Sequence, residues 1–461
     1  MSLIANKPPI EFRVNFIRGR SQNMLDSMLP VFANVVNEIC PTEETGLTRA
    51  LSQSLARFFP LAQEKTLDNY STEIVGKLFG MIVQKSEGFC EISPLTEKLI
   101  AESDQPAFFK VLASRLQFPN PMNRSRTDYE SDMREKLHIR PLVLVLEVMS
   151  KLGGPAAYLE LRTFVLANKR ALTGELDAKE IVTQILEARQ HKLDLPDPDS
   201  PNRPFHHQHI KEMLKLLQLA NLLYLSSDGF YVLNTKESKS LEWVMKFDSK
   251  NNLFRPLASS EEYRDYQREW SEWYGALPDD DGEDSVSTPL EALDISHQVG
   301  LPYSSSPKYS STQELGRAGE SIVLTWQLEK VRKLRPQDLK HVKDRSAERG
   351  IGFDIQSVWC DSIRDGQFHY LEVKTTKRST RPAPDDSQLD LVTLTSNEYR
   401  AAQSHGANFS VCRVYLFPNG YDIYVINDPV KLSEWGHVIL EPADWNLYLT
   451  AKALDKPEVE G

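Results

Sequence analysis

Apolar residues recur at three- and four-residue spacing through the early part of the chain. Residues 21–40 follow this spacing, which is that of an amphipathic helix. Residues 66–100 then predict a helix, a turn at Ser86-Glu87-Gly88, a short strand and another helix. This order favours a winged-helix module, although any small helical domain would show it too.

A second unit with a similar pattern begins near Ile139. Helices are predicted at residues 139–154, 158–170 and 177–190, followed by a proline-rich break at 195–207 and a helix with a hairpin at 210–234. Gly153-Gly154 suits a helix end, and Ser227-Asp228-Gly229 suits the turn of the hairpin. This ending also resembles a winged helix, whose helix and wing could lie on a duplex.

The periodicity fades between Phe254 and Ser311, where acidic residues, serine and proline dominate, so we interpret this stretch as a linker. Beyond it, the pattern predicts a helix at residues 314–334 and strands at 352–360 and 368–376. A helix capped by Thr395 and two more strands complete an α-β-β-β-α-β-β order. This order predicts a mixed sheet with helices packed on it.

Composition sets few limits. The chain has 461 residues, of which 40% are hydrophobic and 26% charged, which suits about two to four globular domains. No run approaches the roughly 20 apolar residues that cross a bilayer, and the start lacks the apolar region of a cleavable signal. We therefore expect a cytoplasmic protein. The formal net charge of −11 is a weak objection to nucleic-acid binding, which depends on local basic patches and bound metal.

Neither cysteines nor histidines predict a zinc site or a disulfide framework. The four cysteines form no CxxC pair and are expected to be buried small hydrophobes. His206, His207 and His209 lack a carboxylate or cysteine at ligand spacing, so a solvated loop is a better interpretation than a metal cluster.

The candidate chemistry lies on the two strands after the linker. Strand alternation places Glu372 and Lys374 on one face, opposite Leu371 and Val373. The turn residues Asp365-Gly366 favour a tight reversal and an antiparallel hairpin. Asp354 begins the partner strand and can therefore approach the same face.

These residues suit phosphodiester hydrolysis, which needs a hard cation to polarise the phosphate and bind the attacking water. Asp354 and Glu372 can supply the carboxylates that Mg²⁺ prefers, with the main-chain carbonyl of Val373 as a third ligand and Mn²⁺ as a substitute ion. Lys374 would orient or deprotonate the water and offset developing charge. Glu320, on the preceding helix, would complete the metal shell or hold Lys374 and a water. An E-x-K triplet alone is usually a solvated charge pair; three acids and a lysine in helix–strand–hairpin order make a stronger case.

The segments GRAGE, GFDI, YLEVKTT, LTSNEY and CRVYLF resemble, in that order, the PD-(D/E)XK nuclease superfamily, and its NO VEIN C-terminal branch most closely. The resemblance covers about residues 314–429. It implies that Glu320 is the helix acid, Asp354 the first metal aspartate, and Glu372 and Lys374 the E-x-K pair. Phe353 stands where the short motif has proline, and an aromatic-Asp pair is common in this branch.

Several neighbours of this site carry a second interpretation. We expect two basic runs to contact phosphates: Lys330, Arg332, Lys333, Arg335, Lys340, Lys343, Arg345 and Arg349, and then Lys377, Arg378 and Arg381. Glu398 is better explained as a helix-capping residue than as a further active-site acid. Arg413 could reach a phosphate or pair with an acid, and His369 and Tyr370 are expected to pack rather than stack on bases.

The N-terminal half more loosely resembles the target-recognition regions of restriction endonucleases of the AlwI type, on the segments ISPLTEKLI, LQFPNP, IRPLVLVLEVM and YLELRTFVLANK. The full division is then a helical, winged-helix-like DNA-recognition domain at 1–135, a second such domain at 136–253, a linker at 254–311, an α/β nuclease domain at 312–445 and a tail at 446–461.

The function expected is a magnesium-dependent endonuclease acting on double-stranded DNA in a restriction or anti-phage system. One active site per chain implies a homodimer when both strands are cut. The alternatives are a nicking or structure-specific nuclease, a nuclease subunit of a larger defence complex, and a catalytically silent DNA-binding regulator. No P-loop pattern is present, so ATP-driven translocation would need a partner.

Overall fold

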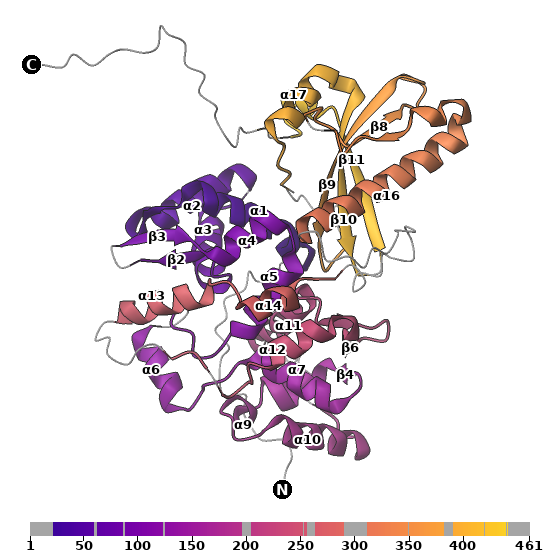
Figure 1. Cartoon of the computed structure of the whole chain (residues 1–461). Coiled ribbons are helices and arrows are strands. Elements are labelled where there is room, and N and C mark those ends of the chain that lie inside the picture. The colour runs from indigo at the N-terminus through magenta and orange to yellow at the C-terminus, as the bar shows by residue number, and fades with distance from the viewer. Residues whose placement is uncertain are drawn as a thin grey trace, which may run out of the picture. The chain divides into compact units, whose positions relative to one another are not determined.

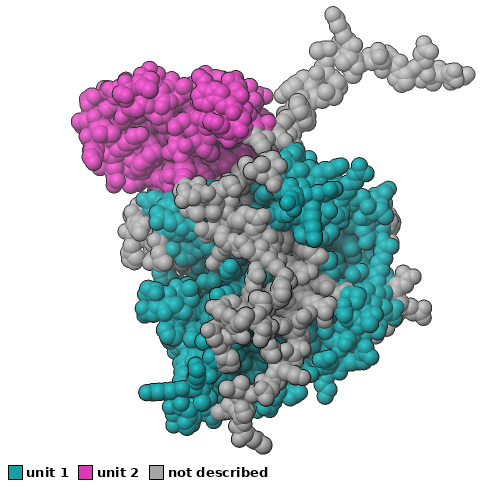
Figure 2. Space-filling model, turned by 180° about the vertical axis from the view of Figure 1, so that it is seen from behind, with its two compact units in different colours: residues 1–318, 375–391, 414–422 teal, residues 319–374, 392–413, 423–461 magenta. Residues whose placement is uncertain are grey.

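The computed structural model divides the chain into two compact units that interleave along the sequence (Figure 2). Unit 1 contains residues 1–318, 375–391 and 414–422, and unit 2 contains residues 319–374, 392–413 and 423–461. The structure describes residues 22–59, 62–85, 88–122, 125–195, 204–251, 253–255, 263–289, 311–348, 350–381, 391–418, 420–438 and 440. In these ranges no helix combines the length and the apolar character that crossing a membrane requires. The domain boundaries proposed from the sequence stay a prediction.

The first part of unit 1 is helical with one small sheet, as the apolar spacing predicts (Figure 1). Its helices are α1 (Gln22–Ile39), α2 (Glu44–Phe58), α3 (Glu64–Asn69) with the π-helical segment η1 (Tyr70–Leu78), α4 (Pro94–Glu102), α5 (Gln105–Arg115) and α6 (Arg126–Arg134). The sheet has the order β1 (Thr42–Glu43), β3 (Phe89–Ile92), β2 (Ile82–Gln84). Gly88 has a φ of +79° and permits the reversal between β2 and β3, since glycine adopts this conformation at little cost. The predicted helix, strand and helix are confirmed, whereas Ser86 and Glu87 of the predicted turn lie outside the described residues.

The second part repeats this combination of helices and hairpin. Its helices are α7 (Pro141–Leu152), α8 (Tyr158–Glu160) with η2 (Leu161–Leu166), α9 (Lys169–Leu172), α10 (Ala178–Gln190), α11 (Pro204–Leu219), η3 (Thr235–Glu237) and α12 (Ser238–Met245). The sheet has the order β4 (Ala156–Ala157), β6 (Phe230–Leu233), β5 (Leu223–Leu225). Gly153 caps α7 with a φ of +65°, and Gly229, with a φ of +81°, lies in the turn before β6. Both positions were predicted from the sequence. One hydrophobic cluster runs from Leu25 to Val286.

The segment predicted as a linker contains two helices, which corrects that prediction where the chain is described. Helix α13 spans Tyr263–Tyr274 and α14 spans Asp280–Val286. Trp270 and Tyr274 are each 1% exposed, and their rings stack with centroids 5.5 Å apart. The aromatic residues of α13 recur at helical spacing, but its many charged residues hide that periodicity. Residues 290–310 of the predicted linker lie outside the described part.

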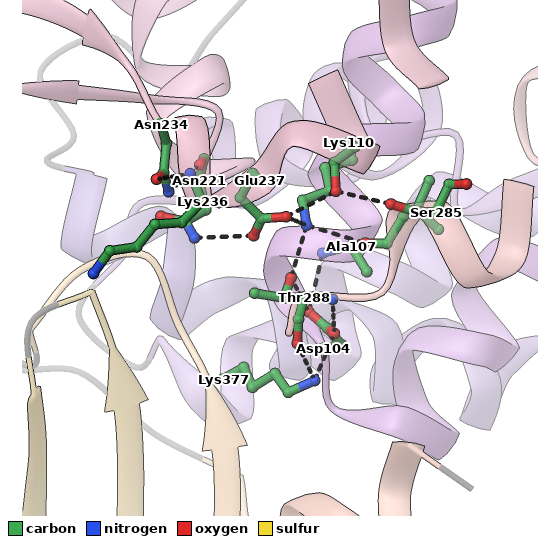
Figure 3. A network of polar contacts seen from close by, with 12 residues as sticks. Asp104, Ala107, Lys110, Asn221, Asn234, Lys236, Glu237, Ser285, Thr288 and Lys377 are labelled. Atoms are coloured by element: carbon green, nitrogen blue, oxygen red, sulfur yellow. Dashed lines mark hydrogen bonds and ion pairs between the residues drawn. The ribbon is translucent and has the colours of Figure 1, made fainter. Parts of the chain in front are cut away.

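Unit 1 contains a buried polar network (Figure 3). Lys110 Nζ donates to Glu237 Oε2 at 2.8 Å and to Thr288 Oγ1 at 3.0 Å. Asp104 accepts the main-chain N–H of Thr288 at 2.9 Å and the Lys377 ammonium at 3.0 Å. Because Lys110 and Glu237 are almost fully buried, each depends on the other for a compensating charge.

The predicted α-β-β-β-α-β-β order is found in the C-terminal part of the chain. The elements are α16 (Ser311–Leu334), η5 (Pro336–His341), β7 (Lys343–Asp344), β8 (Ile355–Val358), β9 (Phe368–Lys377), α17 (Ser396–His405), η6 (Gly406–Asn408), β10 (Phe409–Phe417), β11 (Gly420–Asn427) and α18 (Pro429–Glu434). The mixed sheet has the order β11-β10-β9-β8-β7. The boundary between the units crosses β9 after Lys374 and β10 after Arg413.

The hairpin of β8 and β9 is antiparallel, as predicted, with Ile355 opposite Leu371. Its connection is longer than the predicted tight reversal, because it takes in residues 359–367. Trp359 closes this loop by accepting the Gly366 N–H at 3.0 Å and donating to the Gln367 carbonyl at 2.8 Å. Gly366, with a φ of +80°, forms only the last bend.

All four cysteines are free thiols. Cys90 and Cys412 are buried as expected, whereas Cys40 and Cys360 are half-buried.

Candidate active site

The β8–β9 register places Asp354 beside the predicted E-x-K pair. The Asp354 N–H donates to the Leu371 carbonyl at 2.9 Å, and its Oδ2 accepts the Val373 N–H at 2.8 Å. Lys374 Nζ lies 2.8 Å from Glu372 Oε1. The structure therefore brings Asp354, Glu372 and Lys374 together within unit 2.

Glu398 joins this cluster, although the sequence favours a capping role for it over an active-site role. Its Oε2 lies 2.8 Å from Lys374 Nζ and also accepts the Thr395 N–H at 2.8 Å. The Glu398 N–H donates back to Thr395 Oγ1 at 3.4 Å, so the predicted capping box is confirmed. One carboxylate thus caps α17 and pairs with the lysine.

Two acids of the cluster, Glu372 and Asp354, have raised pKa values. Burial raises the pKa of Glu372 to about 9, and the negative charges of Asp354 and Glu398 oppose the stabilising effect of Lys374. Burial also raises the pKa of Asp354, although the Val373 N–H and Lys374 act against it. The two negative charges are therefore poorly compensated when both carboxyls are ionised.

Lys374 remains charged. Burial alone would lower its pKa, but Glu372 and Glu398 outweigh that effect and raise it above its ordinary value. Conversely, Lys374 outweighs burial at Glu398 and lowers the pKa of that carboxyl. The ammonium is consequently held in place by two carboxylates rather than poised to lose its proton.

The donor chemistry fits a hard divalent cation. Asp354 and Glu372 present oxygens, and a cation between them would offset the repulsion that raises their pKa values. Across the described ranges, no group of three His, Cys, Asp or Glu side chains is arranged to hold a metal ion. An ion that takes one or two carboxylates and keeps several waters, as Mg²⁺ does, would suit Asp354 and Glu372. The carbonyl of Val373 stays a predicted third ligand.

Glu320 lies half-buried on α16. It shares a helix face with Gln327, two turns further on, and Gln327 Oε1 accepts the Ser357 hydroxyl of β8 at 2.8 Å. Its face is thus the one that packs toward β8, and its part in the site stays a prediction.

The residues just before Asp354 are tightly packed. A Cβ on Gly352, whose φ is +79°, would lie 2.4 Å from the Asn397 carbonyl oxygen of α17. The Phe353 ring packs on Tyr370 with centroids 4.8 Å apart, and the His369 ring stacks on Trp359 at 3.7 Å. The predicted packing roles of His369 and Tyr370 are confirmed.

The predicted phosphate contacts need correction at the second basic run. Lys377 is 4% exposed and Arg378 3% exposed. The Lys377 ammonium lies 3.0 Å from Asp104, and the Arg378 guanidinium lies 3.7 Å from Asp26. Arg381, though exposed, pairs with Asp422 at 2.7 Å. Lys377 and Arg378 are therefore structural residues of unit 1.

The first basic run is only partly available. Arg335 pairs with Asp338 and Asp365, and Arg345 pairs with Glu348. The members that are exposed are Arg332, Lys333, Lys340 and Lys343. Arg349 and the side chains of His206, His207 and His209 lie outside the described residues, and Arg413 is buried on β10.

Comparison with known protein families gives two matches. Residues 7–271 match the family described as restriction endonuclease BpuJI, N-terminal, and residues 319–426 match the C-terminal domain of the protein NO VEIN. The NO VEIN resemblance predicted from the motifs is confirmed. The N-terminal half, whose segments loosely resemble the AlwI type, matches BpuJI.

Among solved structures, the BpuJ1 endonuclease binding domain, crystallised in complex with pyrene- and phenanthrene-modified DNA, matches with a TM-score of 0.51 and 29% identity. The alignment covers 59% of this chain and 100% of that chain. No match is found among curated proteins. Because the BpuJI match spans more than half of the sequence, the chain belongs to the BpuJI restriction endonuclease N-terminal family and joins to it a PD-(D/E)XK-like NO VEIN C-terminal domain.

Proposed function

We propose that this protein is a magnesium-dependent DNA endonuclease of a restriction or anti-phage system, in which the N-terminal half recognises DNA and the C-terminal domain cuts it. The observation that carries the proposal is the Lys374 ammonium held 2.8 Å from both Glu372 and Glu398, beside Asp354. A protein that only bound DNA would not need these partly compensated buried charges, which are costly to keep.

DNA recognition is assigned to the N-terminal half because the related BpuJ1 domain was crystallised with DNA and aligns over its whole length. We assign the two antiparallel hairpins, β2–β3 and β5–β6, as the wings of two winged-helix-like modules. The second hairpin carries exposed apolar side chains at Tyr224, Leu225 and Phe230, which suit contact with sugars and bases.

In the proposed reaction, Asp354, Glu372 and the Val373 carbonyl would hold the cation, and Glu320 would complete the metal shell or hold Lys374 and a water. Bound Mg²⁺ would polarise the scissile phosphate and lower the pKa of a water. Lys374, fixed by Glu398, orients that water and offsets the charge that develops on the phosphorane. Its raised pKa favours this electrostatic role over proton abstraction.

A cut in both strands requires two such centres, so we propose a homodimer on double-stranded DNA. The alternatives are a nuclease subunit of a larger defence complex and a catalytically silent DNA-binding regulator.

The test is incubation of the protein with varied plasmid and phage DNA and Mg²⁺, beside Asp354→Ala and Lys374→Ala variants. A Lys431→Ala variant is the control, since Lys431 is an exposed lysine of α18 outside the cluster. Cleavage by the wild type and the control, lost in both site variants, supports the nuclease. DNA binding without cleavage on any substrate would reject it in favour of the regulator.

A further inference from the structure

Unit 1 contains a cavity of about 420 Å³ whose lining includes no residue of the carboxylate cluster. Its walls come from the end of α5, the start of α7, α12, α13 and the segment before α14. The lining side chains that carry charge are Arg115, Arg140, Lys246 and Asp279. The volume lies within the range of small-molecule sites, roughly 300–1,000 Å³.

The cavity is positively charged. Arg115 is 9% exposed and Arg140 2% exposed, and burial lowers the pKa of each guanidinium to about 10, which still leaves both charged at neutral pH. The charge of Arg140 also acts on Arg115 to lower its pKa. Lys246 adds a third cation, and Asp279, the one carboxylate among the described lining residues, lies 3.7 Å from Lys246.

The arginines also have a structural role. Arg115 donates to the carbonyls of Tyr274 and Leu277 at 3.1 and 3.0 Å, where α13 has ended, and Arg140 donates to the Phe247 carbonyl after α12. Cations suit helix C-termini. These carbonyls are uncharged acceptors, however, so they satisfy hydrogen bonds without cancelling the charges that Arg115 and Arg140 bring to the same cavity.

Aromatic rings complete the walls. Trp273 stacks on Phe254 with centroids 4.7 Å apart and has the Arg115 guanidinium 6.0 Å from its ring. Trp243 lies 4.9 Å from Phe247, and Lys246 Nζ is 5.8 Å from the Trp243 ring. Indole faces beside cations suit a ligand that has both a flat ring and a negative group.

We propose that this cavity binds a small phosphorylated ligand with an aromatic base, of the size of a mononucleotide. The phosphate lies against Arg115, Arg140 and Lys246, and the base lies beside the half-buried Trp273 ring. The ligand is either a free nucleotide or a nucleotide of bound DNA, which have this chemistry in common. The inference goes beyond the proposed cleavage and does not depend on it.

The probes are deoxyadenosine 5′-monophosphate, inorganic phosphate and deoxyadenosine, titrated calorimetrically into the full chain in EDTA and low salt. We expect the mononucleotide to bind at one site, phosphate to bind at least about fivefold more weakly because stacking is lost, and the nucleoside to bind weakest. No heat with either phosphate compound at millimolar concentration would overturn the proposal.

Substitutions of the exposed charged residues that line the cavity test the location of the site without disturbing the core. Lys246→Met should weaken mononucleotide binding about two- to fivefold, and Asp279→Asn should strengthen it by a similar factor, as exposed charge pairs allow. The matched controls are Lys239→Met on α12, which ends just before Lys246, and Asp280→Asn next to Asp279. Both should leave the affinity unchanged. Equal affinity in all four variants would place the ligand elsewhere and reject this site.

Arg115→Lys keeps the charge but loses the guanidinium fork, and a folded variant should bind about tenfold or more weakly. If Arg115→Lys does not fold, the Lys246 and Asp279 variants still test whether the ligand binds in this cavity. Competition with a DNA duplex separates the two sources. If the site holds a nucleotide of bound DNA, the duplex displaces the mononucleotide. If the site holds a free nucleotide, the mononucleotide stays bound in the presence of the duplex.

Discussion

Substitution of Gly352 tests whether the close packing of α17 sets the geometry of the carboxylate cluster. Gly352 lies two residues before Asp354, has a φ of +79°, and its missing Cβ would lie 2.4 Å from the Asn397 carbonyl oxygen and 2.8 Å from the Ala401 Cβ. Asn397 is next to Glu398, which holds Lys374. In Gly352→Ala the backbone of α17 must therefore retreat by at least about 0.6 Å to reach 3.0 Å.

Two effects add in this variant. A left-handed φ costs a non-glycine residue about 1–2 kcal/mol, and overpacking costs about 1–3 kcal/mol, so we expect about 2–5 kcal/mol of local destabilisation. Gly350 supplies the control, because it has a φ of +84° but nothing within 4 Å of its Cβ position. Gly350→Ala should show the conformational cost alone, about 1–2 kcal/mol.

Hydrogen exchange measured on the α17 peptide reports the free energy of local opening, and plasmid cleavage in Mg²⁺ reports the site. Gly352→Ala should lower the opening free energy of α17 by about 1–3 kcal/mol more than Gly350→Ala does, and should cleave at least about tenfold more slowly, because small misplacements are costly in catalysis. Equal exchange in the two variants would refute the packing argument. Equal cleavage with unequal exchange would show that α17 does not position the reacting groups.

Three further predictions follow from the charges. Lys374→Met removes the ammonium between Glu372 and Glu398, so cleavage should fall about a hundredfold or more with DNA affinity in a gel-shift assay nearly unchanged; equal losses in both would point to misfolding. The pKa of Glu372, raised to about 9 by burial, means that the folded state favours the protonated carboxyl. Metal-free protein should thus lose stability as pH rises from about 4.5 toward 9, and Glu372→Gln or added Mg²⁺ should flatten that dependence in thermal unfolding; an unchanged slope in Glu372→Gln would show that another group causes it. In unit 1, Lys110→Met leaves Glu237 as an uncompensated buried charge and should destabilise by about 3–5 kcal/mol in urea unfolding, whereas adding Glu237→Leu should restore much of the loss; no recovery in the double variant would argue against charge as the cause.

The parts of the site that the sequence predicted are those that local structure determines. Alternation along one strand places Glu372 and Lys374 on one face, and the hairpin brings Asp354 to them, whatever the rest of the chain does. The capping box at Thr395 is a four-residue pattern. Each depends on neighbours in sequence, so periodicity was enough.

The errors arose where distant parts of the chain decide. Lys377 looked like a solvated phosphate-binding residue because its partner, Asp104, lies 273 residues away, and no local pattern announces that pairing. Helix α13 was missed because charged residues separate its aromatic side chains, and its burial depends on a core that residues far upstream provide. Charged residues in a sequence suggest exposure, whereas tertiary pairing buries Lys377.

Glu398 shows why the two roles weighed for it were not alternatives. A glutamate at the third position of a capping box has its side chain directed back to the first N–H of the helix, which limits its rotamers before any catalytic partner is considered. The Oε2 that accepts the Thr395 N–H also contacts Lys374, so the cap positions the carboxylate that in turn fixes the ammonium. The capping box, which stabilises α17 locally, therefore also preorganises the Lys374 ammonium. Thr395→Val should consequently reduce both the cleavage rate and the stability of α17. Ala402→Gly, in the buried middle of α17, weakens the helix without freeing Glu398. It should therefore reduce stability more than it reduces cleavage.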